Sequence, residues 1–381
     1  DRLRRVEQTS HASYFRDNPL YADLLKRLSG PDPSRRDRIE LQRDLNGLNM
    51  LAHVLSRTRK REVQEHQPLR RARVVRTDPV EAEQQFYALV TRSCREAYRR
   101  LGDGSFAAFA TMMPQRQAAS CMVAMVDNFL ERRQGAAASL LAEVSDLIPE
   151  DFDFDSDAAP APSRPILTAT DLRAWRTRLA AHDTKWASLH GVLVELDRQE
   201  LGEKVIVYSY FKRTLAYLAD RLATAGIPAV VITGDVPNLP DDPDRDERGR
   251  RLRLFREDSR IRVLLATEVG DEGLDLQFCH TIVNYDLPWN PMRVEQRIGR
   301  VDRIGQRSPH VTIVSLSMPG TIEDRILERL YLRIGIFERS VGDLETILGE
   351  EVKKLTAELF SRDLSPNEQE RLIEQAADVI E

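Results

Sequence analysis

The chain has 381 residues, of which 41% are hydrophobic, so it is long enough to bury more than one core. Its net charge of −5 excludes a uniformly basic surface for nucleic acid, and any affinity for DNA must come from a local groove. The three cysteines lack metal or disulfide spacing and no apolar run is long enough to span a membrane. We therefore expect no metal site, no membrane segment and a soluble cytoplasmic protein.

The first 150 residues are predicted to be mainly helical. Residues 1–55 indicate amphipathic helices broken at 30–34, and a short strand is expected around Val74 and Val75. Residues 80–145 carry apolar side chains at helical spacing. The segment that follows, 151–164, is acidic and then rich in Ala and Pro, which predicts a flexible linker; an autoinhibitory mimic of DNA is the alternative for its acidic half.

From residue 204 onward, short apolar runs alternate with amphipathic segments, and 321–381 is helical again. This alternation with right-handed crossovers predicts an α/β fold with a doubly wound parallel sheet, in which ligands gather at the carboxyl ends of the strands. The expected strands are 204–210, 229–234, 261–266, 281–285 and 311–317, and the expected helices are 211–225, 248–258 and 292–303.

Residues 296–306 read QRIGRVDRIGQ and place several arginines on one predicted helix. Arg300 and Arg303 are three residues apart, so they project from the same face and repel each other unless an anion lies between them. The forked donors of arginine suit phosphate oxygens. A solvated basic helix is the simpler interpretation of such a pair taken alone.

The neighbouring segments favour the phosphate interpretation. The sequence TEVGDEGLD lies at 267–275, DLPWNP at 286–291, and the arginine segment follows. In this order and spacing they resemble motifs V and VI of superfamily 2 helicases. The combination is similar to the Swi2/Snf2 class of DNA translocases, nearest its bacterial RapA-like branch.

The resemblance implies a RecA-like second motor lobe at 165–320. It further implies that residues 1–79 are the end of a first motor lobe with connecting helices, that 80–150 are a helical insertion, and that 321–381 are a helical C-terminal extension, with 151–164 as the linker.

The resemblance also implies which residues meet the nucleotide. Arg300 and Arg303 match the arginine fingers that act on the γ-phosphate of ATP, while Arg297 is expected to form structural pairs and Asp302 to orient a guanidinium. The other expected contributors on the nucleotide side are Gln296, Gly270, Gly273 and Asp275.

Contacts to DNA are implied for a second group of residues. Trp289 matches a tryptophan that lies against the tracked duplex, although a tryptophan is more often part of a core. Arg248 is expected either to bind a phosphate or to pin its own helix. The remaining expected contacts to the DNA backbone are Thr267, Ser209, Thr233 and Gly234.

No phosphate-binding loop of the form G-x-x-x-x-G-K-[ST] is present, since Gly-Lys does not occur in the chain. The resemblance therefore implies the second lobe of an ATP-dependent double-stranded DNA translocase. ATP and Mg²⁺ would be bound mainly by a first lobe, upstream or on a partner, and this chain alone would be inactive. RNA polymerase recycling and anti-phage defence are the settings it suggests. The alternatives are a non-catalytic DNA-binding or assembly subunit and a strand-separating helicase.

Overall fold

The computed structural model describes residues 19–28, 41, 68–101, 105–132, 169–199, 203–239, 242, 245–271, 274–288, 291–303 and 306–324. The chain divides into two compact units, Asp1–Glu65 and His66–Glu381. In the first, helix α3 (Pro19–Leu28) buries Tyr21 and Leu24 against Leu41, as expected of an amphipathic helix. The linker at 151–164 and the expected C-terminal helices beyond residue 324 lie outside the described residues.

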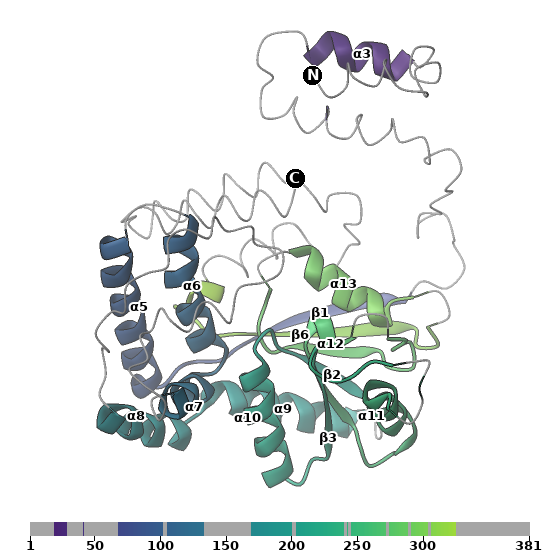
Figure 1. Cartoon of the computed structure of the whole chain (residues 1–381). Coiled ribbons are helices and arrows are strands. Elements are labelled where there is room, and N and C mark those ends of the chain that lie inside the picture. Colours follow the sequence, from purple (N-terminus) through teal and green to yellow (C-terminus); the bar gives the residue numbers. More distant parts are fainter. Residues whose placement is uncertain are drawn as a thin grey trace. The chain divides into compact units, whose positions relative to one another are not determined.

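The second unit is built on a six-stranded parallel sheet with the strand order β1-β6-β5-β2-β4-β3 (Figure 1). Its inner strands are nearly continuous runs of buried apolar residues, as parallel strands covered on both faces require. The sheet confirms the predicted α/β fold. The strands are β1 (Leu69–Arg76), β2 (Val205–Tyr208), β3 (Ala229–Ile232), β4 (Val263–Ala266), β5 (Thr281–Asn284) and β6 (His310–Ser317).

Strand β1 corrects one of the expected domain limits. Residues 1–79 were assigned to a first motor lobe, but β1 pairs along its whole length with β6 of the sheet expected at 165–320. The strand is rich in arginine, and an edge position suits it because charged side chains discourage pairing with further chains. The sheet therefore recruits a strand from before the helical insertion, and the other domain limits stay predictions.

Among the described residues, five helices lie between β1 and β2, and they confirm the predicted helical periodicity. Phe86, Val90, Met122, Met125 and Phe129 are all buried in the main core, so the expected apolar stripe and the methionines fill the interior. The helices are α5 (Glu81–Leu101), α6 (Ser105–Ser120), α7 (Met122–Arg132), α8 (Ala169–Ala181) and α9 (Thr184–Gln199).

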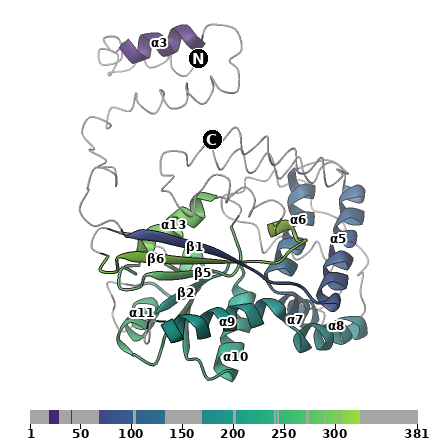
Figure 2. The same ribbon diagram turned by 180° about the vertical axis from the view of Figure 1, so that it is seen from behind.

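The helices cover both faces of the sheet, with α9 and α10 (Lys212–Thr224) on one face and α13 (Pro291–Val301) on the other (Figures 1 and 2). Alternation along β2 sends Val205 and Val207 into the core with α10, and Tyr208 to the face of α13. Helix α11 (Glu247–Glu257) packs beside β3, and the short α12 (Glu268–Asp271) follows β4. None of the described helices is long and apolar enough to cross a membrane.

Candidate functional site

The arginines of α13 lie in different environments, and Arg297 is the buried one, with 1% of its side chain exposed. Its Nη1 donates to Asn284 Oδ1 (2.9 Å) and to the carbonyl of Asp286 (3.1 Å). Its Nη2 lies 2.8 Å from a carboxylate oxygen of Glu268 in α12, and its guanidinium stacks on the ring of Tyr208. These contacts agree with the structural pairing expected of Arg297, and they tie α13 to β5, to the following loop and to the segment after β4.

Arg300 lies in the last turn of the same helix, and Arg303 lies two residues after the helix ends at Val301. Arg300 is half-buried and Arg303 is exposed. No hydrogen bond or ion pair joins the Arg303 side chain to another residue in the part of the chain that the structure describes. A guanidinium presented in this way is available to an anion that approaches from outside the lobe.

Residues 267–271 turn into the short helix α12 directly after β4. The Thr267 hydroxyl accepts from the Gly270 N–H (3.1 Å) and caps α12, and the residue is only 5% exposed. A Cβ on Gly270 would lie 2.4 Å from the Ile232 carbonyl, so only glycine fits against β3. Asp275 is exposed and accepts from the Gln277 N–H, while Gly273 lies outside the described residues. The capping role and burial of Thr267 do not favour its expected contact with DNA.

Asp286 is fully buried after β5 and organises the adjoining strand end. Its carboxylate accepts from the hydroxyls of Ser209 (2.5 Å) and Ser120 (2.7 Å) and from the Tyr210 N–H (2.8 Å). Ser209 is itself fully buried. The prediction that Ser209 meets the DNA backbone is therefore wrong in this structure, because its hydroxyl faces Asp286 and has no access to solvent.

Helix α6 explains this burial, since Ser120 at its end contacts Asp286 and Arg116 contacts Leu287, both just after β5. Arg116 of α6 is 1% exposed, donates to the Leu287 carbonyl (3.0 Å), and stacks 4.8 Å from the ring centre of Tyr210. Sequence analysis did not single out Arg116. In the sequence, Arg116 stands out only as a charged residue in an apolar helix. That pattern does not predict a hydrogen bond to a residue 171 positions away.

The other residues expected on the DNA side have mixed environments. Arg248 is buried and donates to the Val236 carbonyl (3.2 Å), so the structure favours the pinning of its helix over the binding of phosphate. Thr233 and Gly234, after β3, are half-exposed. Trp289 lies outside the described residues, and Gln296 is exposed on α13.

Asp302 does bind a guanidinium, but it is that of Arg70 in β1, which sequence analysis missed. Arg70 donates to Asp302 Oδ2 (2.7 and 3.0 Å) and to both carboxylate oxygens of Glu295 (2.8 and 2.9 Å). Burial lowers the pKa of Arg70, but the hydrogen bonds and charges of the two carboxylates outweigh it and raise this pKa above its usual value. The cluster of Arg70, Glu295 and Asp302 is called the α13 clamp below.

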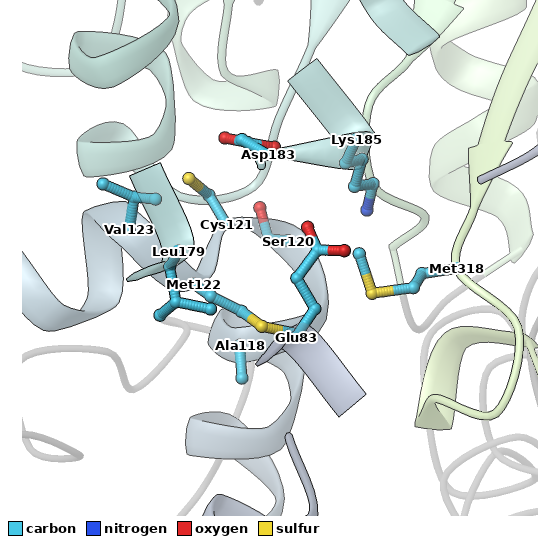
Figure 3. Close-up of a pocket in the computed structure, with 10 residues that line it drawn as sticks. All are labelled: Glu83, Ala118, Ser120, Cys121, Met122, Val123, Leu179, Asp183, Lys185 and Met318. Atoms are coloured by element: carbon cyan, nitrogen blue, oxygen red, sulfur yellow. The ribbon is translucent and has the colours of Figure 1, made fainter. Parts of the chain in front are cut away.

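Glu83 of α5, Ser120 of α6 and Lys185 of α9 line a small cavity (Figure 3). The Lys185 ammonium donates to the Ala119 carbonyl (2.8 Å) and pairs with Glu323 (3.2 Å). Burial raises the pKa of Glu323 to about 7, with Lys185 opposing and Asp286 adding to the rise. Among the described residues no group of His, Cys, Asp and Glu side chains could hold a metal ion.

We predict that Gly270→Ala destabilises the chain strongly, because the added Cβ would approach the Ile232 carbonyl to 2.4 Å in a place where only backbone could move. Gly299→Ala on α13 is the matched control, since a Cβ there meets nothing within 4 Å and alanine favours a helix by up to about 1 kcal/mol. Thermal unfolding should show a lower Tm for the first variant only. Equal melting of the two variants would contradict the close packing of motif V on β3.

We predict that Glu323 makes stability depend on pH. Its carboxyl has a pKa of about 7 when folded and an ordinary value of 4.5 otherwise, so between these values the folded chain keeps a proton that the unfolded chain has lost. Its contribution is therefore full below the ordinary pKa and is lost as the pH rises through about 7. Glu323→Gln should gain stability relative to wild type from pH 5 to pH 8 in urea unfolding. A difference that stays constant with pH would rule this out.

Comparisons with known proteins agree with these motifs. Residues 184–305 match the helicase conserved C-terminal domain. The chain is 43% identical over 150 residues to the "Uncharacterized ATP-dependent helicase YqhH" of Bacillus subtilis (strain 168), which covers 39% of this chain and 25% of that protein. It is 30% identical over 169 residues to the "DNA excision repair protein ERCC-6-like" of Danio rerio, covering 44% and 11%. The chain thus spans a quarter or less of the length of these relatives.

Similar solved structures include the C-terminal part of the Fun30 ATPase domain, with 16% identity and a TM-score of 0.47 over 78% of this chain and 100% of that one. The Sulfolobus solfataricus SWI2/SNF2 ATPase core in complex with dsDNA has 15% identity and a TM-score of 0.48, covering 80% and 50%. With sequence identities and TM-scores this low, these two structures carry no argument about function. These matches make residues 184–305 similar to the helicase conserved C-terminal domain, and the segments at 267–275 and 286–305 lie within the matched range.

Proposed function

We propose that this chain supplies the second motor lobe of an ATP-dependent double-stranded DNA translocase. The phosphate-binding lobe would lie on the same polypeptide or on a partner. The observation that carries the proposal is a difference between two arginines of the motif: Arg297 of α13 is buried in structural pairs, while Arg303, just after the helix, is exposed and its side chain has no partner among the described residues. The Arg303 guanidinium is therefore available to an anion that approaches from outside the lobe. The RapA-like branch is part of this proposal and rests on the motifs alone.

In the proposed reaction, water attacks the γ-phosphorus of ATP and the bond to the bridging oxygen breaks, yielding ADP and phosphate. Negative charge develops on the phosphoryl and leaving oxygens as the bond breaks. Arg300 and Arg303 would donate to these oxygens when the two lobes close, and the buried anchoring of Arg297 would hold their helix steady. The exposed Gln296 and Asp275 would flank the nucleotide.

Thr233, Gly234 and Trp289 would contact the DNA. Thr233 and Gly234 are half-exposed at the end of β3. Trp289 directly follows a stretch whose carbonyls are held by Arg297 at Asp286 and by Arg116 at Leu287. Because Arg297 of α13 and Arg116 of α6 both hold the residues just before Trp289, a movement of α13 on ATP binding would also move Trp289 relative to the DNA.

In the complete protein, we predict that Arg300→Ala or Arg303→Ala lowers the rate of ATP hydrolysis by at least about 100-fold while DNA affinity stays nearly unchanged. The reason is that a finger stabilises charge that develops only in the transition state. Steady-state phosphate release measures the rate, and fluorescence anisotropy of labelled duplex measures affinity.

The exposed Arg253 of α11 offers a control, since Arg253→Ala removes the same charge outside the proposed site and should hydrolyse ATP normally. Normal turnover in both finger variants would overturn the assignment. The chain on its own should show no turnover, because it lacks a phosphate-binding loop. Turnover by the isolated chain that the finger substitutions abolish would contradict the need for a first lobe.

We further predict that Trp289→Ala uncouples hydrolysis from movement, because its ring is proposed to lie against the duplex and not the nucleotide. ATP binding should persist, while DNA-stimulated hydrolysis and the displacement of a third strand from duplex DNA fall together.

Trp175→Ala is the matched control, since Trp175 is half-buried on α8 against Phe86 and lies in no proposed site. Both proteins are compared below their melting temperatures, since the loss of a buried Trp costs about 3–5 kcal/mol. Normal strand displacement by folded Trp289→Ala would return this residue to a core role.

A further inference from the structure

We propose that Arg70, in edge strand β1, is a positioning residue for the arginine fingers. This inference rests on the proposed function, and it adds a residue that lies 225 positions or more before the carboxylates it binds in α13. Arg70 would not touch the nucleotide. It would act through the α13 clamp, which holds the end of the helix that carries Arg300 and that Arg303 follows.

The geometry of the clamp is unusually complete for a single side chain. Nη1 and Nη2 of Arg70 each meet a different oxygen of Glu295, at 2.8 and 2.9 Å, while Nε and Nη2 meet Asp302 Oδ2 at 3.0 and 2.7 Å. The three side chains are 6%, 11% and 10% exposed, so water screens the attraction only weakly. Charge-assisted bonds of this kind are among the strong ones in proteins, and a bidentate pair also fixes orientation.

The clamp holds the last two turns of α13. Glu295 lies within the helix, and Asp302 lies seven residues later, directly after the helix ends at Val301, so Arg297 and Arg300 lie between the two carboxylates and Arg303 follows the second one. Two carboxylates bound by one guanidinium would otherwise repel each other, and the positive charge between them offsets that repulsion. Arg70 thereby holds the end of α13 against strand β1.

The position of Asp302 gives the clamp a second effect. Asp302 is adjacent in sequence to Arg303, and its carboxylate is buried in contact with Arg70. An Asp302 released from Arg70 would be a negative charge beside a finger, where it would compete with the γ-phosphate for the same donors. Occupying Asp302 with Arg70 therefore favours a finger that points outward.

Strand β1 is well suited to anchor the helix. Arg70 is paired in register with Val311 of β6, so it belongs to the sheet and not to a loop. The strand divides its arginines between the two faces: Arg70 meets α13, while Arg73 forms an exposed ion pair with Glu195 of α9 on the opposite face. This alternation provides a control three residues away in the same strand.

The test is a double-mutant cycle in the complete protein. Arg70→Gln should lower kcat for ATP hydrolysis by about tenfold with little change in the KM for ATP, since a finger displaced by a fraction of an ångström loses transition-state contacts first. In a background that lacks both fingers, Arg300→Ala with Arg303→Ala, Arg70→Gln should cause almost no further loss, because the groups that it positions are already gone. Arg73→Gln should leave kcat and KM unchanged in either background.

A purely structural role would lower the rate by the same factor in both backgrounds, and that additive result would overturn the proposal. Unchanged kcat in folded Arg70→Gln, together with the expected loss in Arg303→Ala, would overturn it too while leaving the finger assignment intact. Normal turnover in Arg303→Ala would point instead to failure of the proposed function. If Arg70→Gln does not fold, Arg70→Lys, which keeps a charge but not the fork, enters the same cycle with a smaller expected loss.

Discussion

The arrangement of this lobe depends on the burial of one guanidinium, that of Arg297. Removing such a charge from water costs several kcal/mol, so the surrounding chain must supply compensating partners. Here they come from four places: the Asn284 amide, the Asp286 carbonyl, the Glu268 carboxylate and the Tyr208 ring. A single side chain therefore fixes α13, the segment after β4 and the loop after β5 relative to one another.

A second constraint operates at the carboxyl edge of the sheet, where Asp286 is buried. A buried carboxylate needs donors, and Ser209, Ser120 and the Tyr210 N–H provide them. Because Ser120 belongs to α6, satisfying Asp286 also seats the helical insertion on the ends of β2 and β5. The strand ends along this edge therefore differ in exposure. Helix α6 covers the ends of β2 and β5, while Thr233 and Gly234 after β3 are half-exposed.

The clamp around Arg70 and the cluster around Arg297 hold the same helix at different points. Arg297 projects from α13 and contacts Asn284 of β5 and Tyr208 of β2. Glu295 and Asp302 instead bind Arg70 of the edge strand β1. A helix fixed on two sides can present Arg303 to solvent without needing that residue for its own stability. This separation of anchoring arginines from an exposed one is what supports the proposed reaction.

Much of this follows from the sequence alone. Continuous apolar runs in β2, β4 and β5 predicted buried parallel strands, and the spacing of Phe86, Val90, Met122 and Met125 predicted the helices around them, since periodicity reflects local geometry. The tertiary structure alone decided that β1 joins this sheet, that Ser209 faces Asp286 and that Asp302 binds Arg70. Each of these contacts joins residues that are far apart in the chain. Hydrophobic periodicity shows which side of an element is buried, but it does not show which distant polar residue will bind a given side chain.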